Sequence, residues 1–227
     1  MSNGRAINRD ALAIGVATGA YGVSFGVLAV GAGLDTAKAC AMSLLVFTGA
    51  SQFAVISVLG AGGGVAAALA PALLLASRNL AYGLSMAPIL RGSRRARAWQ
   101  SQLVIDESTA MARAQEEPAA ARHAFLATGI SVFVFWNLGT LIGALAGEGL
   151  GDPRDFGLDA MFPAAFLALM APQLRRPGAP QAAIAGAVLA VALLPVAPAG
   201  VPVLVAAAGV VPGVLAARLA VRGGGTT

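Results

Sequence analysis

The sequence predicts an all-α protein, a polytopic membrane helix bundle of about seven transmembrane segments, from its composition and its long apolar runs. Hydrophobic residues make up 58% of the chain and charged residues 11%, with a mean hydropathy of +0.79. A soluble domain carries about 25% charged residues, so this chain has too few to cover a water-facing surface. Its 29 Gly residues suit helices that pack closely in lipid. We therefore expect a single integral membrane domain over residues 1–227.

The apolar runs supply the individual segments. A helix needs about 20 apolar residues to span a bilayer. The runs that approach or exceed this length are 11–34, 39–59, 65–90, 124–147, 160–174, 179–196 and 199–217. The first run is too long for the core of a signal peptide, and we expect it to remain in the protein.

The connections between these runs carry most of the charge. Six Arg residues lie in the polar stretch 91–122, and Lys/Arg-rich loops remain cytoplasmic. The connection 148–159 holds four acidic residues and one Arg, as suits an outside loop. We therefore expect residues 91–122 and the C-terminus in the cytoplasm. The net charge of +5 is interpreted as a topology signal, not as a nucleic-acid surface.

The N-terminal half leaves two alternatives open. Three full crossings before Arg91 would place Arg5 and Arg9 outside, against the positive-inside rule. Either the N-terminus is outside, or one of the first three runs is broken or re-entrant.

A short internal repeat bears on this choice. The triplet Gly-Leu-Asp occurs at 33–35 and again at 157–159, each time before a small-residue apolar run. It favours an outside N-terminus and two inverted three-span repeats. In that interpretation residues 1–90 form the first repeat, and 123–222 form the second repeat and the final span.

Polar residues inside the runs are the candidate functional residues. Arg78-Asn79 lies within 65–90, and a charge at bilayer depth costs about 3–15 kcal/mol. A buried site is preferred over the alternative that Arg78 ends a shorter helix near one surface. Residues 48–52 and Trp136-Asn137 also place amide, hydroxyl or indole groups at mid-depth, where an unpaired polar group costs several kcal/mol. The candidate substrate-binding residues are Thr48, Gly49, Ser51, Gln52, Arg78, Asn79, Trp136 and Asn137.

Gln52 and the acidic pair Asp106-Glu107 have purely structural alternatives to a functional role. Gln52 serves equally well as a hydrogen-bonding contact between helices. Asp106 and Glu107, in the polar stretch, are from spacing alone expected to pair with nearby Arg side chains.

Other sites are not expected. The chain has no phosphate-binding Gly-rich loop, no metal-ligand cluster and no placeable catalytic triad, because it holds one His and one Cys. We therefore expect neither an enzyme nor a metal or cofactor site.

Several stretches together resemble the AzlC-type branched-chain amino acid permeases. They are 43–53 for the second-span signature, 78–85 for the third-span motif, Asp106-Glu107 for the central acidic pair, and 136–143 for the fourth-span Trp motif. They follow one another in order across most of residues 10–175. This chain departs from the family where Ser77 and Asn79 flank Arg78, because the family commonly has Asn before the Arg and His after it.

The resemblance implies a membrane permease subunit that exports leucine, valine and isoleucine across the plasma membrane with a small hydrophobic AzlD-type partner. We expect proton-driven secondary transport, with an ATP-driven permease, a passive small-solute pore and a non-transporting scaffold as alternatives. Arg78 is expected to hold the substrate carboxylate, and Gln52, Asn79 and opened backbone near Gly49 its ammonium. Asp106 and Glu107 are expected to act in gating or partner docking.

Overall fold

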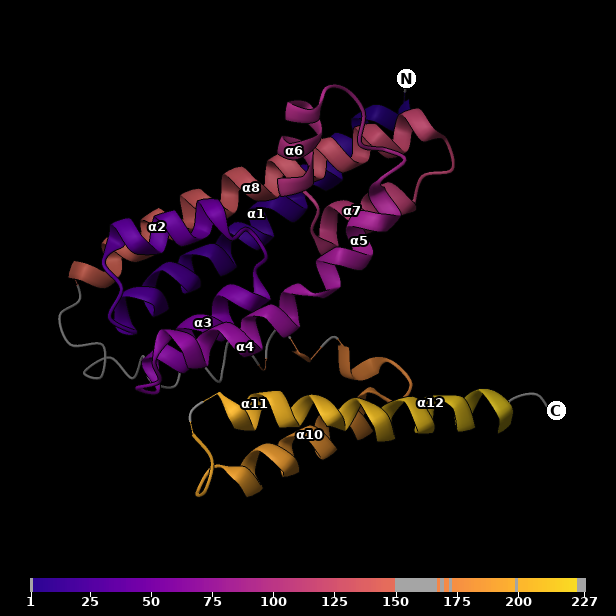
Figure 1. The fold of residues 1–227 in the computed structure, drawn as a ribbon. Helices are drawn as coiled ribbons and strands as arrows, with labels where there is room; N and C mark the ends of the chain where they lie inside the picture. Colours follow the sequence, from indigo (N-terminus) through magenta and orange to yellow (C-terminus); the bar gives the residue numbers. More distant parts are fainter. Residues whose placement is uncertain (1, 150–166, 168–169, 172, 199, 224–227) are drawn as a thin grey trace.

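The computed structural model describes residues 2–149, 167, 170–171, 173–198 and 200–223, and all regular structure in these residues is helical. Helices α1 to α8 form one bundle, and α10 to α12 form a separate hairpin beside it (Figure 1). The all-α bundle that the composition predicts is confirmed.

The two longest helices, α1 (Ser2–Gly31) and α8 (Pro118–Gly149), pack together along most of their length and run in the same direction (Figure 1). Contacts advance along both helices together: Asn8 with His123, Gly15 with Ser131, Gly22 with Trp136, and Gly26 with Thr140. A Cβ atom added at Gly26 would lie 2.2 Å from the Thr140 carbonyl oxygen, so glycine is what permits this approach.

The second apolar run does not form one spanning helix. It is divided into α2 (Thr36–Leu45) and α3 (Ala50–Gly60). α2 begins beside the end of α8, where Thr36 N–H donates to Glu148 Oε1 at 3.0 Å. It ends near the middle of α8, where the rings of Phe47 and Phe133 lie 5.1 Å apart. α3 then runs back toward the end of the bundle where α2 begins, so α2 and α3 form a re-entrant hairpin (Figure 1).

The third run crosses the bundle as two helical pieces, α4 (Val65–Ala76) and α5 (Arg78–Met86), which meet at Ser77. Together they are long and apolar enough to cross a membrane. The end of α5 packs in the same cluster as Phe125, near the beginning of α8. This segment therefore carries the chain back to the end of the bundle where α8 begins.

The polar stretch forms a second hairpin, made of α6 (Arg94–Gln102) and α7 (Asp106–Arg113). Its tip, Leu103 to Ile105, is buried, with at most 6% of each side chain exposed. Leu103 lies against Gly129, close to the middle of α8. The three apolar tip residues thus enter the bundle, although the stretch 91–122 is polar and basic overall.

The arrangement decides between the two N-terminal alternatives. Inverted three-span repeats would make α1 and α8 antiparallel, whereas they are parallel. The preferred interpretation, with an outside N-terminus, therefore gives way to the re-entrant second run. With only α1 and α4–α5 crossing before Arg91, Arg5 and Arg9 lie at the same end as the basic stretch, as the positive-inside rule requires.

The C-terminal hairpin consists of α10 (Ala179–Leu193), followed by α11 (Val201–Ala206), the 3₁₀ turn η4 (Ala207–Gly209) and α12 (Val210–Gly223). A shorter 3₁₀ turn, η3 (Gln173–Arg175), precedes it. Among the described residues, four segments are long and apolar enough to span a membrane: Gly4–Gly31, Val65–Met86, Pro118–Gly149 and Val201–Ala220. Most of the expected span 160–174 and most of the connection 148–159 lie outside the described residues.

Candidate functional site

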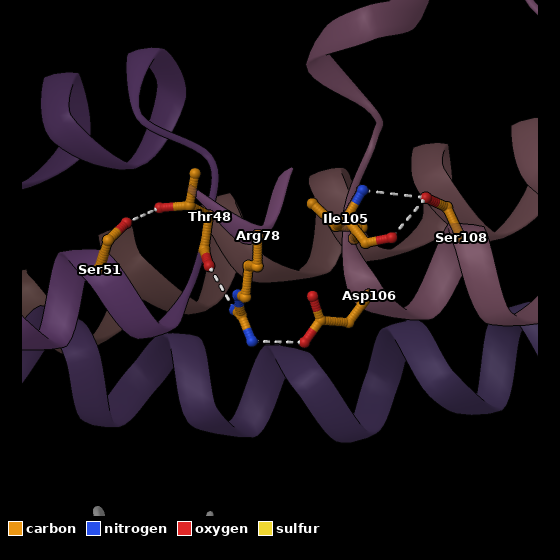
Figure 2. A network of polar contacts seen from close by, with 6 residues as sticks. All are labelled: Thr48, Ser51, Arg78, Ile105, Asp106 and Ser108. Carbon is orange, nitrogen blue, oxygen red and sulfur yellow. Dashed lines mark hydrogen bonds and ion pairs between the residues drawn. The ribbon is translucent and has the colours of Figure 1, made fainter. Parts of the chain in front are cut away.

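Arg78 lies where the two hairpins meet the α4–α5 segment (Figure 2). Its Nη1 donates to Asp106 Oδ2 at 2.6 Å, and its Nη2 donates to the Thr48 carbonyl oxygen at 3.3 Å. The guanidinium thus joins α5, the break between α2 and α3, and the first residue of α7. About a third of the Arg78 side chain (36%) and 41% of Asp106 remain exposed, so a ligand could reach both charges.

The break that presents Thr48 is built by local hydrogen bonds. Gly49 adopts φ +63°, a left-handed conformation that glycine tolerates, and this separates α2 from α3. The amide of Gln52 closes the break, because Oε1 accepts from Gly49 N–H at 3.0 Å and Nε2 donates to the Met42 carbonyl at 3.3 Å. The Thr48 and Ser51 hydroxyls also bond to each other (Figure 2).

These contacts give Gln52 and Thr48 different roles. Gln52 is fully buried and both ends of its amide are engaged, so it braces the hairpin and does not face a ligand space. Thr48 is the residue of this stretch whose backbone reaches Arg78.

The tip of the second hairpin holds Asp106 in place. Ile105 N–H donates to Ser108 Oγ at 3.2 Å, and Ser108 Oγ donates to the Ile105 carbonyl at 3.2 Å (Figure 2). Ser108 Oγ also donates to the Leu103 carbonyl at 2.6 Å. This capping arrangement makes Asp106 the first residue of α7, where the helix dipole favours a carboxylate. Asp106 pairs with Arg78 on another segment, so the expected pairing with a neighbouring Arg of the polar stretch is wrong for Asp106.

The two hairpins also contact each other directly. Gln102 Nε2 donates to the Leu44 carbonyl at 2.9 Å and reaches the Leu45 carbonyl at 3.4 Å. The last carbonyls of a helix have no partner within that helix, and a broken helix inside a bundle must find one elsewhere. Gln102 therefore ties the end of α2 to the tip between α6 and α7.

A pocket of about 290 Å³ lies between the hairpins and α5, a volume near the lower end for small-molecule sites. Its lining combines apolar residues with a few polar groups. The lining residues are Leu45, Val46, Phe47, Thr48, Asn79, Gly83, Leu90, Ser101, Gln102 and Val104. The Asn79 Oδ1 atom is buried and has no hydrogen-bond partner in the described part of the chain, so it is a free acceptor beside Arg78.

Trp136 and Asn137, the candidate residues of the fourth apolar run, do not lie in the pocket beside Arg78. Trp136 is 6% exposed and packs against Phe25 and Phe53, with ring centroids 6.1 Å from each. Asn137 Nδ2 donates to the Phe133 carbonyl of its own helix at 2.8 Å. Neither residue lines the pocket, although Trp136 lies behind Gly49 and supports the break from the core.

Sequence reasoning did not identify Ser101, Gln102 and Val104 as pocket residues. They belong to a stretch that is basic and polar overall and therefore resembles a solvent-exposed loop. The one signal was the apolar triplet 103–105, which is too short to predict a buried tip without the structure.

A family model described as AzlC protein matches residues 13–150, which include both hairpins and the Arg78–Asp106 pair. An uncharacterized membrane protein of Helicobacter pylori (strain ATCC 700392 / 26695) is 27% identical over 175 residues, covering 76% of each chain. The inner membrane protein YgaZ of Escherichia coli (strain K12) is 28% identical over 225 residues, covering 93% of this chain and 88% of that protein. No solved structure matches the chain. Because the family model spans more than half of its length, this membrane protein belongs to the AzlC family.

Proposed function

We propose that the protein is the large subunit of a permease that exports leucine, valine and isoleucine across the plasma membrane. The observation that carries the proposal is the position of Arg78, at the meeting point of two hairpins that enter the bundle from opposite ends, beside a small mixed pocket. Transporters commonly bind their substrate near the bilayer midplane where helices are broken. Membership of the AzlC family supports the same conclusion.

The chemistry of a branched-chain amino acid fits these residues. The planar guanidinium of Arg78 offers a two-pronged donor for a carboxylate. Asn79 Oδ1 has no partner within the described residues and can accept a hydrogen bond from an ammonium group. Phe47, Leu90 and Val104 line the neighbouring pocket and suit an aliphatic side chain.

The hairpins also suggest how access alternates. Gln102 and Arg78 hold the break in α2–α3 against the tip of α6–α7, so the two hairpins close on each other through a few polar contacts. Release of these contacts on one side at a time would expose the pocket alternately to the two faces of the membrane. Asp106 and Glu107 at the start of α7 would then act in gating.

The energy source and the partner are part of the proposal. We infer proton-driven secondary transport and a small hydrophobic AzlD-type partner from the family, with residues 91–122 facing the cytoplasm. Efflux of amino acids from cells loaded with a leucine- or valine-rich dipeptide, with and without the partner and an uncoupler, tests the substrate, the partner and the energy source.

Efflux that requires both subunits and stops with the uncoupler is the expected result. Efflux equal to that of empty cells would contradict the branched-chain proposal. Uncoupler-resistant efflux that depends on a nucleotide-binding partner would identify an ATP-driven permease. Movement that simply follows the concentration gradient would identify a pore.

A further inference from the structure

The Arg78–Asp106 pair is the least exposed of the ion pairs among the described residues. The other two, Arg9–Asp10 and Lys38–Asp35, have side chains that are 49% to 80% exposed, against 36% and 41% for Arg78 and Asp106. It is also the pair that connects separate segments, because the others join residues one or three positions apart. The Arg78–Asp106 pair therefore links α5 to α7 at the candidate substrate site.

The Asp106 carboxylate already occupies the position on Arg78 that a substrate carboxylate would take. Arg78 Nη1 donates to Asp106 Oδ2 at 2.6 Å, so a carboxylate that binds the guanidinium fork has to displace Asp106. The displaced Asp106 would then lose its ion-pair partner in a partly buried position, where water reaches 41% of its side chain and makes up for only part of the loss. A ligand that supplies its own positive group next to its carboxylate removes this penalty.

Resting on the proposed function, we propose that Asp106 determines specificity by binding the ammonium group of the substrate while Arg78 binds its carboxylate. The amino acid thus inserts into the ion pair, and each charge exchanges one partner for another. A molecule with a carboxylate but no ammonium leaves Asp106 unpaired, and an amine without a carboxylate leaves Arg78 unpaired. The site consequently selects zwitterions by a balance of charge, while the pocket selects the side chain.

The surroundings of the pair fit this insertion. Both side chains are partly exposed, so the ligand can reach them without unfolding the tip. Thr48, whose carbonyl accepts from Arg78, and Asn79, whose Oδ1 is free among the described residues, both line the 290 Å³ pocket. An amino acid at the pair can therefore direct its side chain into the pocket next to these two residues.

Competition binding to the purified full-length protein, with its partner subunit where that is required for activity, tests the inference. Radiolabelled leucine is displaced by three compounds with the same branched side chain: leucine itself, 4-methyl-2-oxopentanoate without the ammonium, and 3-methylbutylamine without the carboxylate. In the wild type we expect both analogues to compete at least about 100-fold more weakly than leucine.

The variant Asp106→Asn separates the charge of Asp106 from its size. We expect leucine affinity to fall about 10- to 100-fold, since a hydrogen bond to a charged partner is lost. The preference for leucine over 4-methyl-2-oxopentanoate should disappear, because Arg78 is now free to bind a bare carboxylate. Gained binding of the oxo acid also demonstrates that the variant is folded. Asp106→Glu keeps the charge and should keep the preference, and Asp10→Asn, in the exposed Arg9 pair, is the matched control that should behave as the wild type.

The outcomes distinguish this inference from the proposed function. If Asp106→Asn still prefers leucine over the oxo acid, or if the oxo acid competes as well as leucine in the wild type, the inference is wrong and the export proposal remains. If Asp106→Asn binds neither compound, Asp106→Glu decides, and its loss of the preference for leucine overturns the inference. If the wild type binds no branched-chain amino acid, the proposed function itself fails.

Discussion

At the scale of single residues, Arg78 combines a structural and a proposed binding task. It donates to Asp106 and to the Thr48 carbonyl, and thereby links three segments. Both members of the ion pair are more than a third exposed, so solvent screening keeps the contribution of the pair to stability small. Substitutions at Arg78 should therefore affect transport much more than folding.

Replacing Arg78 with Lys preserves the positive charge and removes the planar two-pronged donor. We expect export to fall about tenfold or more, while the free energy of unfolding changes by no more than about 1 kcal/mol. Arg78→Ala should abolish export. Efflux assays and thermal unfolding in detergent measure the two effects, with Arg9→Ala as the exposed control. Normal export by membrane-inserted Arg78→Ala would remove Arg78 from the site.

At the scale of elements, the interrupted second run depends on Gln52. Its buried amide satisfies Gly49 N–H, which the interrupted helix would otherwise leave unpaired, and adds a second hydrogen bond to the Met42 carbonyl, which also accepts from Val46 N–H at 2.9 Å. An equally local requirement governs the contact between α1 and α8, where the backbones approach too closely for any side chain at several glycines.

Gln52→Leu keeps the volume of the side chain and removes its hydrogen bonds. We expect the free energy of unfolding to fall by about 1–3 kcal/mol, because Gly49 N–H is left without a partner, and the unfolding temperature to fall with it. Gln181→Leu changes an exposed glutamine near the start of α10 and should have little effect. Equal unfolding temperatures for the two variants would contradict the bracing role of Gln52.

Two glycines of α8, Gly143 and Gly149, provide a test and its control for the contact between α1 and α8. A Cβ atom at Gly143 would lie 2.0 Å from the Val23 carbonyl oxygen, whereas one at Gly149 would meet nothing within 4 Å. We expect Gly143→Ala to separate α1 from α8 and destabilise the protein by about 1–3 kcal/mol. Gly149→Ala should be neutral. A thermal unfolding series on both variants checks this, and an unaffected Gly143→Ala would show that the helices do not pack in this register.

At the scale of the whole molecule, the direction of α1 relative to α8 determines the topology. Parallel packing places the N-terminus at the end of the bundle where α8 begins, together with the basic ends of the stretch 91–122. The turn between α3 and α4 lies near the opposite end (Figure 1). Each end of the bundle therefore admits one hairpin.

Accessibility of single cysteines tests this topology. Cys40 is the one cysteine of the chain, so Cys40→Ser supplies a background without thiols. On that background, Arg5→Cys and Arg94→Cys should resist a membrane-impermeant thiol reagent in intact cells, and Ala61→Cys should react. All three positions are exposed in the fold. Labelling that places Arg5→Cys and Arg94→Cys on opposite sides would contradict the parallel packing and restore the inverted-repeat interpretation.

By itself, the sequence determined the class of protein and its chemically unusual positions. Too few charged residues exclude a soluble surface, and Arg78 within an apolar run indicates a polar site inside the bundle. These conclusions depend on composition and on the cost of burying a charge, which are properties of the chain before it folds. The family resemblance likewise depends on local motifs.

Only the tertiary structure decided how those positions combine. Whether an apolar run crosses or turns back depends on which distant groups satisfy its freed backbone, and Gln102 and Arg78 supply those partners from other segments. The pairing of Arg78 with Asp106, the burial of the tip 103–105, and the placement of Trp136 in the core are likewise contacts between remote parts of the chain. Hydropathy is averaged along the sequence and does not record such contacts, so the site became complete only when the two hairpins met.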